Sequence, residues 1–212
     1  MRVMKKIKIF TVGHSNRTIE EFIKLLVQHQ ISAIADVRSQ PYSRFTPHFN
    51  REDIKASLKE CRIDYVFLGE ELGARRNESC CYVDKQAKYE LIKETPAFKS
   101  GLERIQKGAN THKIAMMCSE KDPITCHRTI LISKCLKDVF DVEHIVSSDV
   151  VETHGEAEQR LLRELGMSNN DLFLSSEEVL EDAYKKQADE IAYKEPDETD
   201  LVTSNDPGET ND

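Results

Sequence analysis

Residues 7–18 read Ile-Lys-Ile-Phe-Thr-Val-Gly-His-Ser-Asn-Arg-Thr and contain the pattern on which this fold is built. The stretch from Ile7 to Val12 is apolar and rich in β-branched residues, which is typical of a buried strand. It stops in a run of loop-forming residues that begins at Gly13. Thr18 and Glu21 then have the spacing of a helix capping box. The segment therefore predicts a strand, a loop and a helix in direct succession.

The same succession recurs along the chain. Further strands are predicted at residues 31–37, 65–68, 114–118 and 142–145, and helical patterns separate them, the longest of which include residues 126–137 and 177–193. Strands that alternate with helices of this length indicate a mostly parallel sheet whose crossovers place helices on both faces. The predicted fold class is α/β, a Rossmann-like, doubly wound, mostly parallel five-stranded sheet with a C-terminal helical extension. The Gly-x-Gly-x-x-Gly fingerprint of dinucleotide-binding proteins is absent from the sequence.

The charge of the chain is unevenly distributed. The 212 residues carry a formal net charge of −8, but residues 168–212 contain 3 basic against 14 acidic side chains, which leaves 27 basic and 24 acidic in residues 1–167. We expect an α/β domain over residues 1–167, a docked C-terminal helix over 168–194 and an acidic, disordered tail over 195–212. The body is compatible with an anionic ligand, but it is less basic than a dedicated DNA-binding surface.

The sequence also predicts the cellular environment. It contains six cysteines and no apolar run of the roughly 18 residues that a membrane span needs. The basic stretch at residues 1–10 is interrupted by Lys8, so it predicts a first strand and not a signal peptide. Cysteines in such a chain are expected to be reduced thiols. We therefore expect a cytoplasmic protein without a membrane partner.

Reactive side chains follow the predicted strands at their carboxyl ends. The first strand runs into His14, the second into Asp36 and the fourth into Cys118, whereas the amino ends carry ordinary solvated residues. The carboxyl ends of parallel strands meet at one edge of a sheet, where open α/β folds bind their ligands. The sequence therefore predicts a ligand site at this edge.

Cys126 is the leading candidate nucleophile. It begins a predicted helix, with Thr125 as the candidate cap, and His127 and Arg128 follow it directly. The helix dipole and the basic neighbours would favour a thiolate, and an adjacent imidazole is the usual activator of a nucleophilic cysteine. Cys118 is a second candidate nucleophile, or a resolving thiol for Cys126.

The remaining candidates are chosen by chemistry. The candidate catalytic residues attack, transfer protons or orient an imidazole: Cys126, Cys118, His14, His127, Asp36 and Glu120. The candidate ligand-binding residues carry hydroxyl, amide or guanidinium groups in the strand-end loops: Ser15, Asn16, Arg17, Arg38, Ser39, Ser43, Arg44, Arg75 and Arg128. The arginines and helix N-termini indicate a phosphate-bearing ligand, namely a nucleotide, a sugar phosphate or a nucleic-acid end.

Two alternatives stay open. One is a non-catalytic module that senses a nucleotide or nucleic acid and whose cysteines are structural or redox-responsive. The other is a Cys/His metal site that uses Cys118, Cys126, His127 and His14. Seven residues separate the two cysteines, which does not match a CxxC zinc knuckle or a CxxC redox motif. No metal or other cofactor is therefore predicted, and the preferred function is cysteine-dependent hydrolase or transferase chemistry.

Several of these segments resemble a family catalogued as domain of unknown function 488. The segments that carry the resemblance are residues 12–17, 36–43, 72–75, 117–120 with 126–128, and the C-terminal helix around 183–193. Ala74 stands where the family often has a second glycine. The resemblance implies the fold and the position of the site, but no reaction, since the family is defined without an established activity.

Overall fold

The structure is a computed structural model, and it describes residues 6–167 and 175–196. Its centre is a six-stranded sheet with the order β3-β2-β6-β1-β7-β8. The strands are β1 (Ile7–Gly13), β2 (Ala33–Asp36), β3 (Asp64–Phe67), β6 (Ile114–Cys118), β7 (Phe140–Ile145) and β8 (Val151–Thr153). All neighbouring pairs are parallel except β7 and β8. The five predicted strands are present, and the predicted strand count of five is corrected to six.

The helices alternate with these strands. They are α1 (Ile19–Gln28), α2 (Arg51–Glu60), α3 (Gly69–Leu72), α4 (Tyr89–Ile92), α5 (Pro96–Ala109), α6 (Lys134–Leu136), α7 (His154–Glu164) and α8 (Ser176–Ile191). Short helical turns lie at η1 (Pro47–Phe49), η2 (Ser79–Cys81) and η3 (Pro123–Thr125), a π-helix at η4 (Arg128–Ser133), and a small hairpin at β4 (Tyr82–Val83) and β5 (Gln86–Ala87). The hairpin was not predicted.

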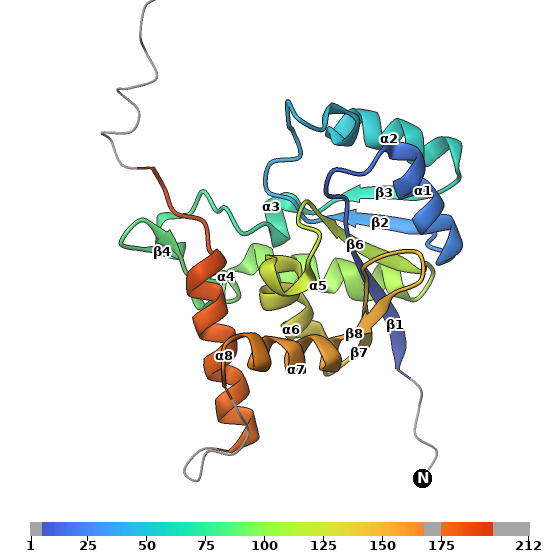
Figure 1. The fold of residues 1–212 in the computed structure, drawn as a ribbon. Coiled ribbons are helices and arrows are strands. Elements are labelled where there is room, and N and C mark those ends of the chain that lie inside the picture. Colours follow the sequence, from blue (N-terminus) through green and yellow to red (C-terminus); the bar gives the residue numbers. More distant parts are fainter. Residues whose placement is uncertain (1–5, 168–174, 197–212) are drawn as a thin grey trace, which may run out of the picture.

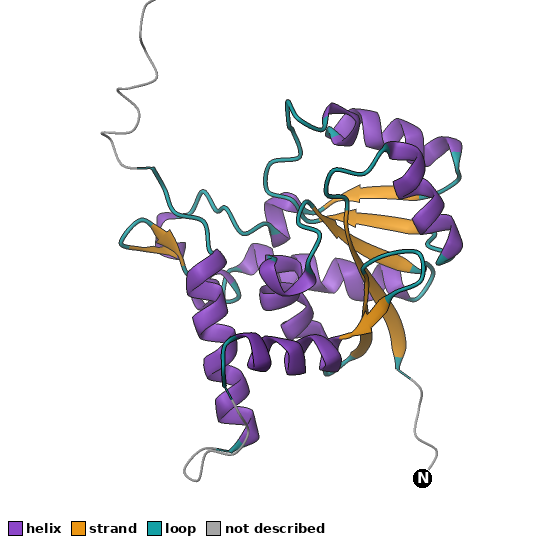
Figure 2. Ribbon diagram, in the orientation of Figure 1, coloured by secondary structure: helices purple, strands orange, loops and turns teal. Residues whose placement is uncertain are grey.

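Helices cover both faces of the sheet (Figures 1 and 2). On one face, buried residues of β1 such as Phe10 and Val12 join a hydrophobic cluster with α1 and α2. On the other face, Ile9 joins a larger cluster that includes residues of α5, η4, α7 and α8. Successive strand residues point to opposite faces, so a continuous apolar run is what burial on both sides requires.

The start of α1 follows the predicted capping box. The Thr18 hydroxyl accepts a hydrogen bond from the Glu21 backbone N–H at 3.3 Å, and the Glu21 carboxylate accepts one from the Thr18 N–H at 3.0 Å. Both bonds satisfy backbone donors that a helix N-terminus leaves without an intrahelical partner. The box fixes where the loop after β1 ends, and with it the position of His14.

The helix predicted over residues 126–137 is present, but Thr125 does not cap it. Cys126 has extended backbone (φ −135°, ψ 140°), and the π-helix η4 begins only at Arg128. The Thr125 hydroxyl caps nothing; it donates to the Asp122 carbonyl at 3.2 Å. Asp122 caps the preceding turn instead, since its carboxylate accepts from the Ile124 N–H at 3.1 Å. Cys126 is the last extended residue before the predicted helix, and its carbonyl accepts the Thr129 and Ile130 N–H groups, so it lies at a helix N-terminus as predicted.

The C-terminal helix α8 lies against the body. The Lys134 ammonium contacts the Glu181 carboxylate at 2.7 Å, and the Gln187 amide donates to the Ile124 carbonyl at 3.0 Å. Residues 168–174, and the predicted disordered tail from residue 197 onward, lie outside the described residues. Among the helices that the structure describes, none has the length and apolar character needed to cross a bilayer.

Candidate functional site

A cavity of about 280 Å³ opens at the carboxyl ends of β2 and β6. Seven of the predicted site residues line it: Arg38, Ser39, Arg75, Cys118, Glu120, Cys126 and His127. The remaining lining residues are Gln40, Tyr42, Ala74, Tyr89, Ser119, Thr125, Ile191 and Tyr193. The fold therefore brings together segments that lie up to about 150 residues apart in the chain, including the end of α8.

Two buried thiols share one carboxylate oxygen on the cavity floor. Cys118 and Cys126 each donate to Glu120 Oε2, at 3.0 and 3.1 Å. The Nδ1 atom of His127 lies 3.7 Å from the Cys118 sulfur and 3.9 Å from the Cys126 sulfur. The other ring nitrogen, Nε2, contacts the Val37 carbonyl at 3.0 Å, and a carbonyl can only accept, so Nε2 carries a proton. His127 therefore presents Nδ1 to both sulfurs.

Cys126 is the thiol that ionises. Burial opposes its ionisation, but a hydrogen bond from Cys118 and the charges of Arg128 and His127 lower the pKa of Cys126 well below its usual range. The same hydrogen bond, together with burial, raises the pKa of Cys118. Burial disfavours the charged form of His127, but its contact with Cys126 prevails and raises the His127 pKa. These directions favour a thiolate on Cys126 and an imidazolium on His127 beside a neutral Cys118 thiol.

The pKa values of two further groups in this cluster are raised. Although much of Glu120 is exposed, its carboxyl group is largely removed from solvent. This burial is the main cause that raises the pKa of Glu120, and the nearby charge of Cys126 adds to it. Tyr89 is buried, and burial raises the pKa of its phenol, with the negative groups of Cys126, Cys118 and Glu120 adding to the effect. Burial is the main cause in both cases, and the neighbouring negative charge adds to it.

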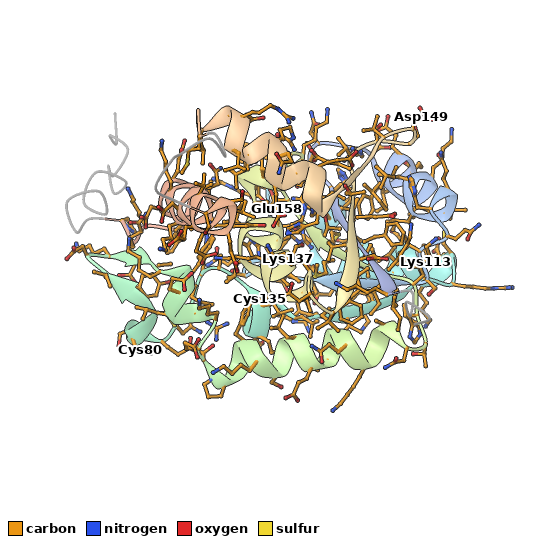
Figure 3. All side chains as sticks on the ribbon, turned by 90° about the horizontal axis from the view of Figure 1, so that it is seen from below. Cys80, Lys113, Cys135, Lys137, Asp149 and Glu158 are labelled. Carbon is orange, nitrogen blue, oxygen red and sulfur yellow. The ribbon has the colours of Figure 1, made fainter. Side chains whose placement is uncertain are left out.

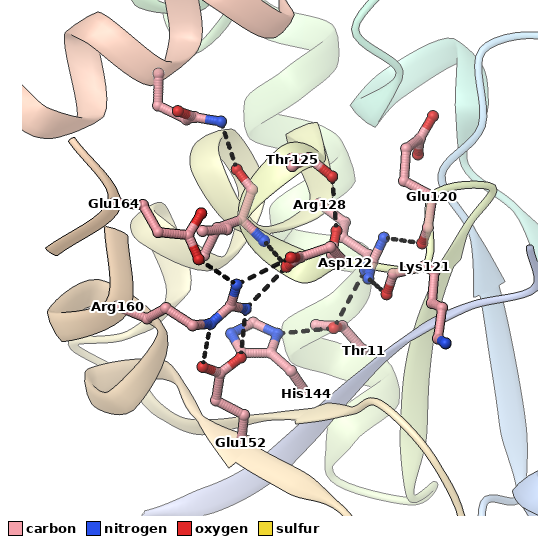
Figure 4. Close-up of polar contacts among 12 residues, drawn as sticks. Thr11, Glu120, Lys121, Asp122, Thr125, Arg128, His144, Glu152, Arg160 and Glu164 are labelled. Carbon is pink, nitrogen blue, oxygen red and sulfur yellow. Dashed lines mark hydrogen bonds and ion pairs between the residues drawn. The ribbon is translucent and has the colours of Figure 1, made fainter. Parts of the chain in front are cut away.

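Arg128 holds the loop that carries Glu120 (Figure 4). Arg128 is buried, with 1% of its surface exposed. Its guanidinium donates to the carbonyls of Glu120 at 2.7 Å and Lys121 at 3.1 Å, and to the Thr11 hydroxyl at 3.4 Å. Carbonyl oxygens satisfy its hydrogen bonds without neutralising its charge. The charge is therefore available to favour the Cys126 thiolate, as the lowered pKa of that thiol reflects.

Arg38 is oriented by a buried carboxylate. Asp36 accepts from Arg38 Nε at 2.9 Å and Nη2 at 2.6 Å, and its Oδ2 also accepts from the Tyr65 hydroxyl at 2.7 Å. Arg38 Nη2 donates to the Phe49 carbonyl at 2.9 Å, and Nη1 lies 3.2 Å from His14 Nε2. A guanidinium has five N–H donors, so these contacts leave one on Nη1. Arg38 can therefore offer that donor to a ligand in the cavity.

His14 contacts Arg38 and helps to position it. Its ring stacks on Phe49 at 4.2 Å between centroids, and its Nδ1 contacts the Ser15 carbonyl at 2.8 Å, so Nδ1 carries the proton and Nε2 accepts from Arg38. Burial, and then the Arg38 charge, lower the pKa of His14 to about 4. His14 is therefore neutral at pH 7 and positions the arginine.

The rim of the cavity combines a cation with aromatic rings. The Arg75 guanidinium lies over the Tyr193 ring at 4.6 Å and donates to the Gln40 side chain at 3.1 Å. Its backbone N–H donates to the Ser39 hydroxyl at 2.9 Å. Tyr42 is 60% exposed at the same rim. Arg75 itself is exposed, so its charge faces an incoming ligand.

Other predicted residues lie near the sheet edge but do not line this cavity: His14, Ser15, Asn16, Arg17, Asp36, Ser43, Arg44 and Arg128. Arg17 donates to the carbonyls of Gly13 at 2.6 Å and Val146 at 2.7 Å, so it ties two strand-end loops together. The Ser43 hydroxyl accepts from the Phe45 N–H at 3.1 Å within its own loop.

The sequence reasoning did not name Tyr65, Tyr89, Gln40, Tyr42 or Tyr193 as site residues. Tyr65 and Tyr89 occur in otherwise apolar patterns, where a tyrosine is read as a core residue. Tyr193 was predicted only as the end of the last helix and as part of the segment that resembles the family. Gln40 and Tyr42 belong to a segment already singled out, and their nearness to Arg38 was the signal that could have found them.

The sequence profile of a family described as "Domain of unknown function DUF488" matches residues 18–135, more than half of the chain. The chain belongs to this family. The matched part of this DUF488 member contains Arg38, Arg75, Cys118, Cys126 and His127, so most of the cavity lies inside the family segment. Parallel comparisons with curated proteins and with solved structures found no match.

Proposed function

We propose that this protein is a cysteine-dependent enzyme that binds a small phosphate-bearing substrate in the cavity and attacks it with Cys126. The observation that carries the proposal is the pair of thiols that share the Glu120 carboxylate, in a cavity that Arg38 and Arg75 also line. The substrate class is a nucleotide, a sugar phosphate or a nucleic-acid end. With water as the acceptor the enzyme is a hydrolase, and with another acceptor it is a transferase.

Each step has a residue in position. The Cys126 sulfur forms a bond to the electrophilic atom of the substrate as the bond to the leaving group breaks. The leaving group keeps the electron pair and takes a proton from His127 Nδ1, which lies 3.9 Å from that sulfur. Water or another acceptor then displaces the sulfur and returns a proton to His127. Glu120 holds the two thiols, and Arg38 and Arg75 neutralise the phosphate.

The proposal keeps the Rossmann-like, doubly wound interpretation of the sheet, in which ligands bind outside the carboxyl ends of the strands. The position of the cavity beyond β2 and β6 supports this interpretation. A reactive thiolate also needs a reducing compartment, and the six cysteines are free, which supports a cytoplasmic location.

A thermal-shift screen over nucleotides, sugar phosphates and short oligonucleotides tests the binding step. A ligand at 100 times its Kd stabilises a protein by about 2.7 kcal/mol, so a hit raises Tm. We expect the shift to shrink in Arg75→Gln and to persist in Arg163→Gln, which removes an exposed charge beside a different cavity. No shift with any phosphate-bearing class, or an equal shift in both variants, would contradict the proposal.

The same ligand then tests the chemistry. We expect Cys126→Ser to bind it and to lose turnover, because a serine hydroxyl is not ionised by these neighbours. Turnover that survives in Cys126→Ser would remove the nucleophile from the proposal. Binding without turnover in the wild-type protein would favour the non-catalytic sensing module instead.

A further inference from the structure

Four donor atoms face one another on the cavity floor. Cys118 Sγ, Cys126 Sγ and a ring nitrogen of His127 all lie within 4.8 Å of one another. Glu120 Oε2 lies 3.0 and 3.1 Å from the two sulfurs. The donors come from the end of β6 and from the segment before η4, which the Arg128 contacts to the Glu120 and Lys121 carbonyls hold together.

The spacing of these atoms fits one tetrahedral ion. Zinc binds thiolate sulfur at about 2.3 Å and imidazole nitrogen at about 2.0 Å, which places the two ligands about 3.6 Å apart. His127 Nδ1 lies 3.7 and 3.9 Å from the two sulfurs. The Glu120 oxygen lies closer to the two sulfurs than ligands of one shared ion would. Because much of Glu120 is exposed, its side chain can shift slightly away from the sulfurs when the ion binds.

The orientation of His127 fits as well. A metal-binding histidine commonly donates its second ring N–H to a carbonyl or carboxylate, which fixes the ring and the tautomer. His127 Nε2 makes this contact with the Val37 carbonyl at 3.0 Å, at the end of β2. Nδ1 therefore faces the sulfurs. It carries a proton in the metal-free protein, and it can coordinate a metal once that proton has left.

We propose that Cys118, Cys126, His127 and Glu120 form a binding site for one soft divalent cation of the zinc class. Two thiolates and an imidazole select such an ion over magnesium or calcium, which prefer oxygen ligands. The seven residues between the cysteines do not weaken the site, because the fold and not a short knuckle brings the donors together.

Binding of the divalent cation is balanced by the release of protons. Cys118 gives up its thiol proton and the Cys126–His127 pair gives up the one proton that it shares, so two protons leave as one dication enters. The two positive charges of the ion then offset the two thiolates, and Arg128 holds the backbone of Glu120 through its carbonyl. Affinity should therefore rise with pH, because protons compete with the metal.

The bound ion would also regulate the thiol chemistry, a consequence that rests on the proposed function. A metal on the Cys126 sulfur occupies the electron pair that attacks the substrate. The enzyme would then be silent with metal and active without it, and the metal would shield both thiols from oxidation.

Competition with a chromophoric chelator tests the site directly. We expect the full-length, metal-free protein to bind one equivalent of Zn²⁺, and Cys118→Ser and His127→Gln to bind it at least tenfold more weakly. Cys61→Ser is the matched control, since Cys61 is an exposed free thiol on another element, and it should bind like the wild type. Equal affinity in all four proteins, or no binding, would overturn the proposal.

A second measurement does not depend on how the variants fold. Co²⁺ added to the wild-type protein should give the charge-transfer absorption of cobalt–thiolate bonds, and Zn²⁺ should abolish it. Absence of that absorption would overturn the metal site. The phosphate-ligand screen is run with a chelator present, so the metal site and the proposed function fail in separate experiments.

Discussion

Asp36 and Arg38 form a buried ion pair beside the cavity, with side chains 0% and 6% exposed. The carboxylate accepts two hydrogen bonds from the Arg38 guanidinium, one from the Arg38 backbone N–H and one from the Tyr65 hydroxyl, so it holds the guanidinium in a fixed orientation. Removing one partner of such a pair leaves a buried charge without compensation, which costs more than the intact pair contributes.

Asp36→Asn should therefore lower the free energy of unfolding by about 3–5 kcal/mol. Urea denaturation of the two proteins measures this difference. Glu94→Gln breaks an ion pair whose side chains are both more than half exposed, and it should leave the denaturation midpoint unchanged. A loss in Asp36→Asn no larger than that in Glu94→Gln would show that the pair does not hold Arg38.

Single residues explain why part of the site was predictable. Asp36 and Cys118 are the last residues of strands and Arg38 comes shortly after one, so their position along the chain already places them at the carboxyl edge. Tyr89 and Tyr193 reach the cavity only through tertiary packing of helical segments, and nothing in their local sequence distinguishes them from core tyrosines.

At the scale of elements, the end of β1 must pass very close to the loop after β6. A Cβ on Gly13 would lie 1.8 Å from the Glu120 carbonyl oxygen and 2.7 Å from its carbon. These are backbone atoms, and Arg128 holds that carbonyl in place, so the loop cannot give way cheaply. A glycine at position 13 therefore lets β1 pass this close to the backbone of the loop that carries Glu120.

We expect Gly13→Ala to lower the free energy of unfolding by about 1–3 kcal/mol, as overpacking does. The control is Gly155→Ala in α7, where a Cβ meets no atom within 4 Å. Alanine there should be neutral or stabilising by about 0.4–1 kcal/mol. Chemical denaturation of both variants checks the contrast, and equal effects would mean that β1 and the loop are not in contact.

The elements also show where local sequence stops being informative. The central strands β2 and β6 were predicted because burial on both faces leaves a nearly continuous apolar run. Strand β8 has three residues, all at least partly exposed, and so carries no such signal. The helix after Cys126 was predicted, but its cap was not, because the Thr125 hydroxyl donates to the Asp122 carbonyl.

At the scale of the whole molecule, a chain of buried polar groups joins the sheet to the two last helices. His144 contacts the Thr11 hydroxyl at 2.8 Å (Figure 4) and the His154 ring at 3.1 Å. The Tyr184 hydroxyl contacts His154 at 2.9 Å and Glu158 at 2.8 Å. Glu158 also pairs with Lys137 at 2.7 Å; both are labelled in Figure 3.

Burial keeps these histidines neutral. It is the main cause that lowers the pKa of His154 to about 4, with Glu158 and Glu152 opposing it and Lys137 adding to it. Burial, followed by the charge of His154, also lowers the pKa of His144 well below its ordinary value. Because the unfolded chain binds these protons more readily, this stability is complete above pH 6.5 and is lost as the pH falls toward 4.

Denaturation midpoints between pH 7 and pH 4 should therefore fall, and His154 alone should account for about 3 kcal/mol. His154→Gln should flatten that part of the profile. His112→Gln, which changes a half-exposed histidine at the other end of the sheet, should leave the slope intact. A slope that is the same in all three proteins would place the acid sensitivity elsewhere.

The most direct test of the central claim compares how iodoacetate and iodoacetamide alkylate Cys126 in metal-free protein, with peptide mass spectrometry as the readout. The two reagents differ in charge, and the exposed Cys61 is an internal reference in the same chain. An ionised thiol beneath Arg38 and Arg75 should prefer the anionic reagent at least tenfold more than Cys61 does, and Arg75→Gln should reduce that preference. If Cys126 reacts with the two reagents in the same ratio as Cys61, the cavity does not direct anions to a reactive thiolate, and the account is wrong.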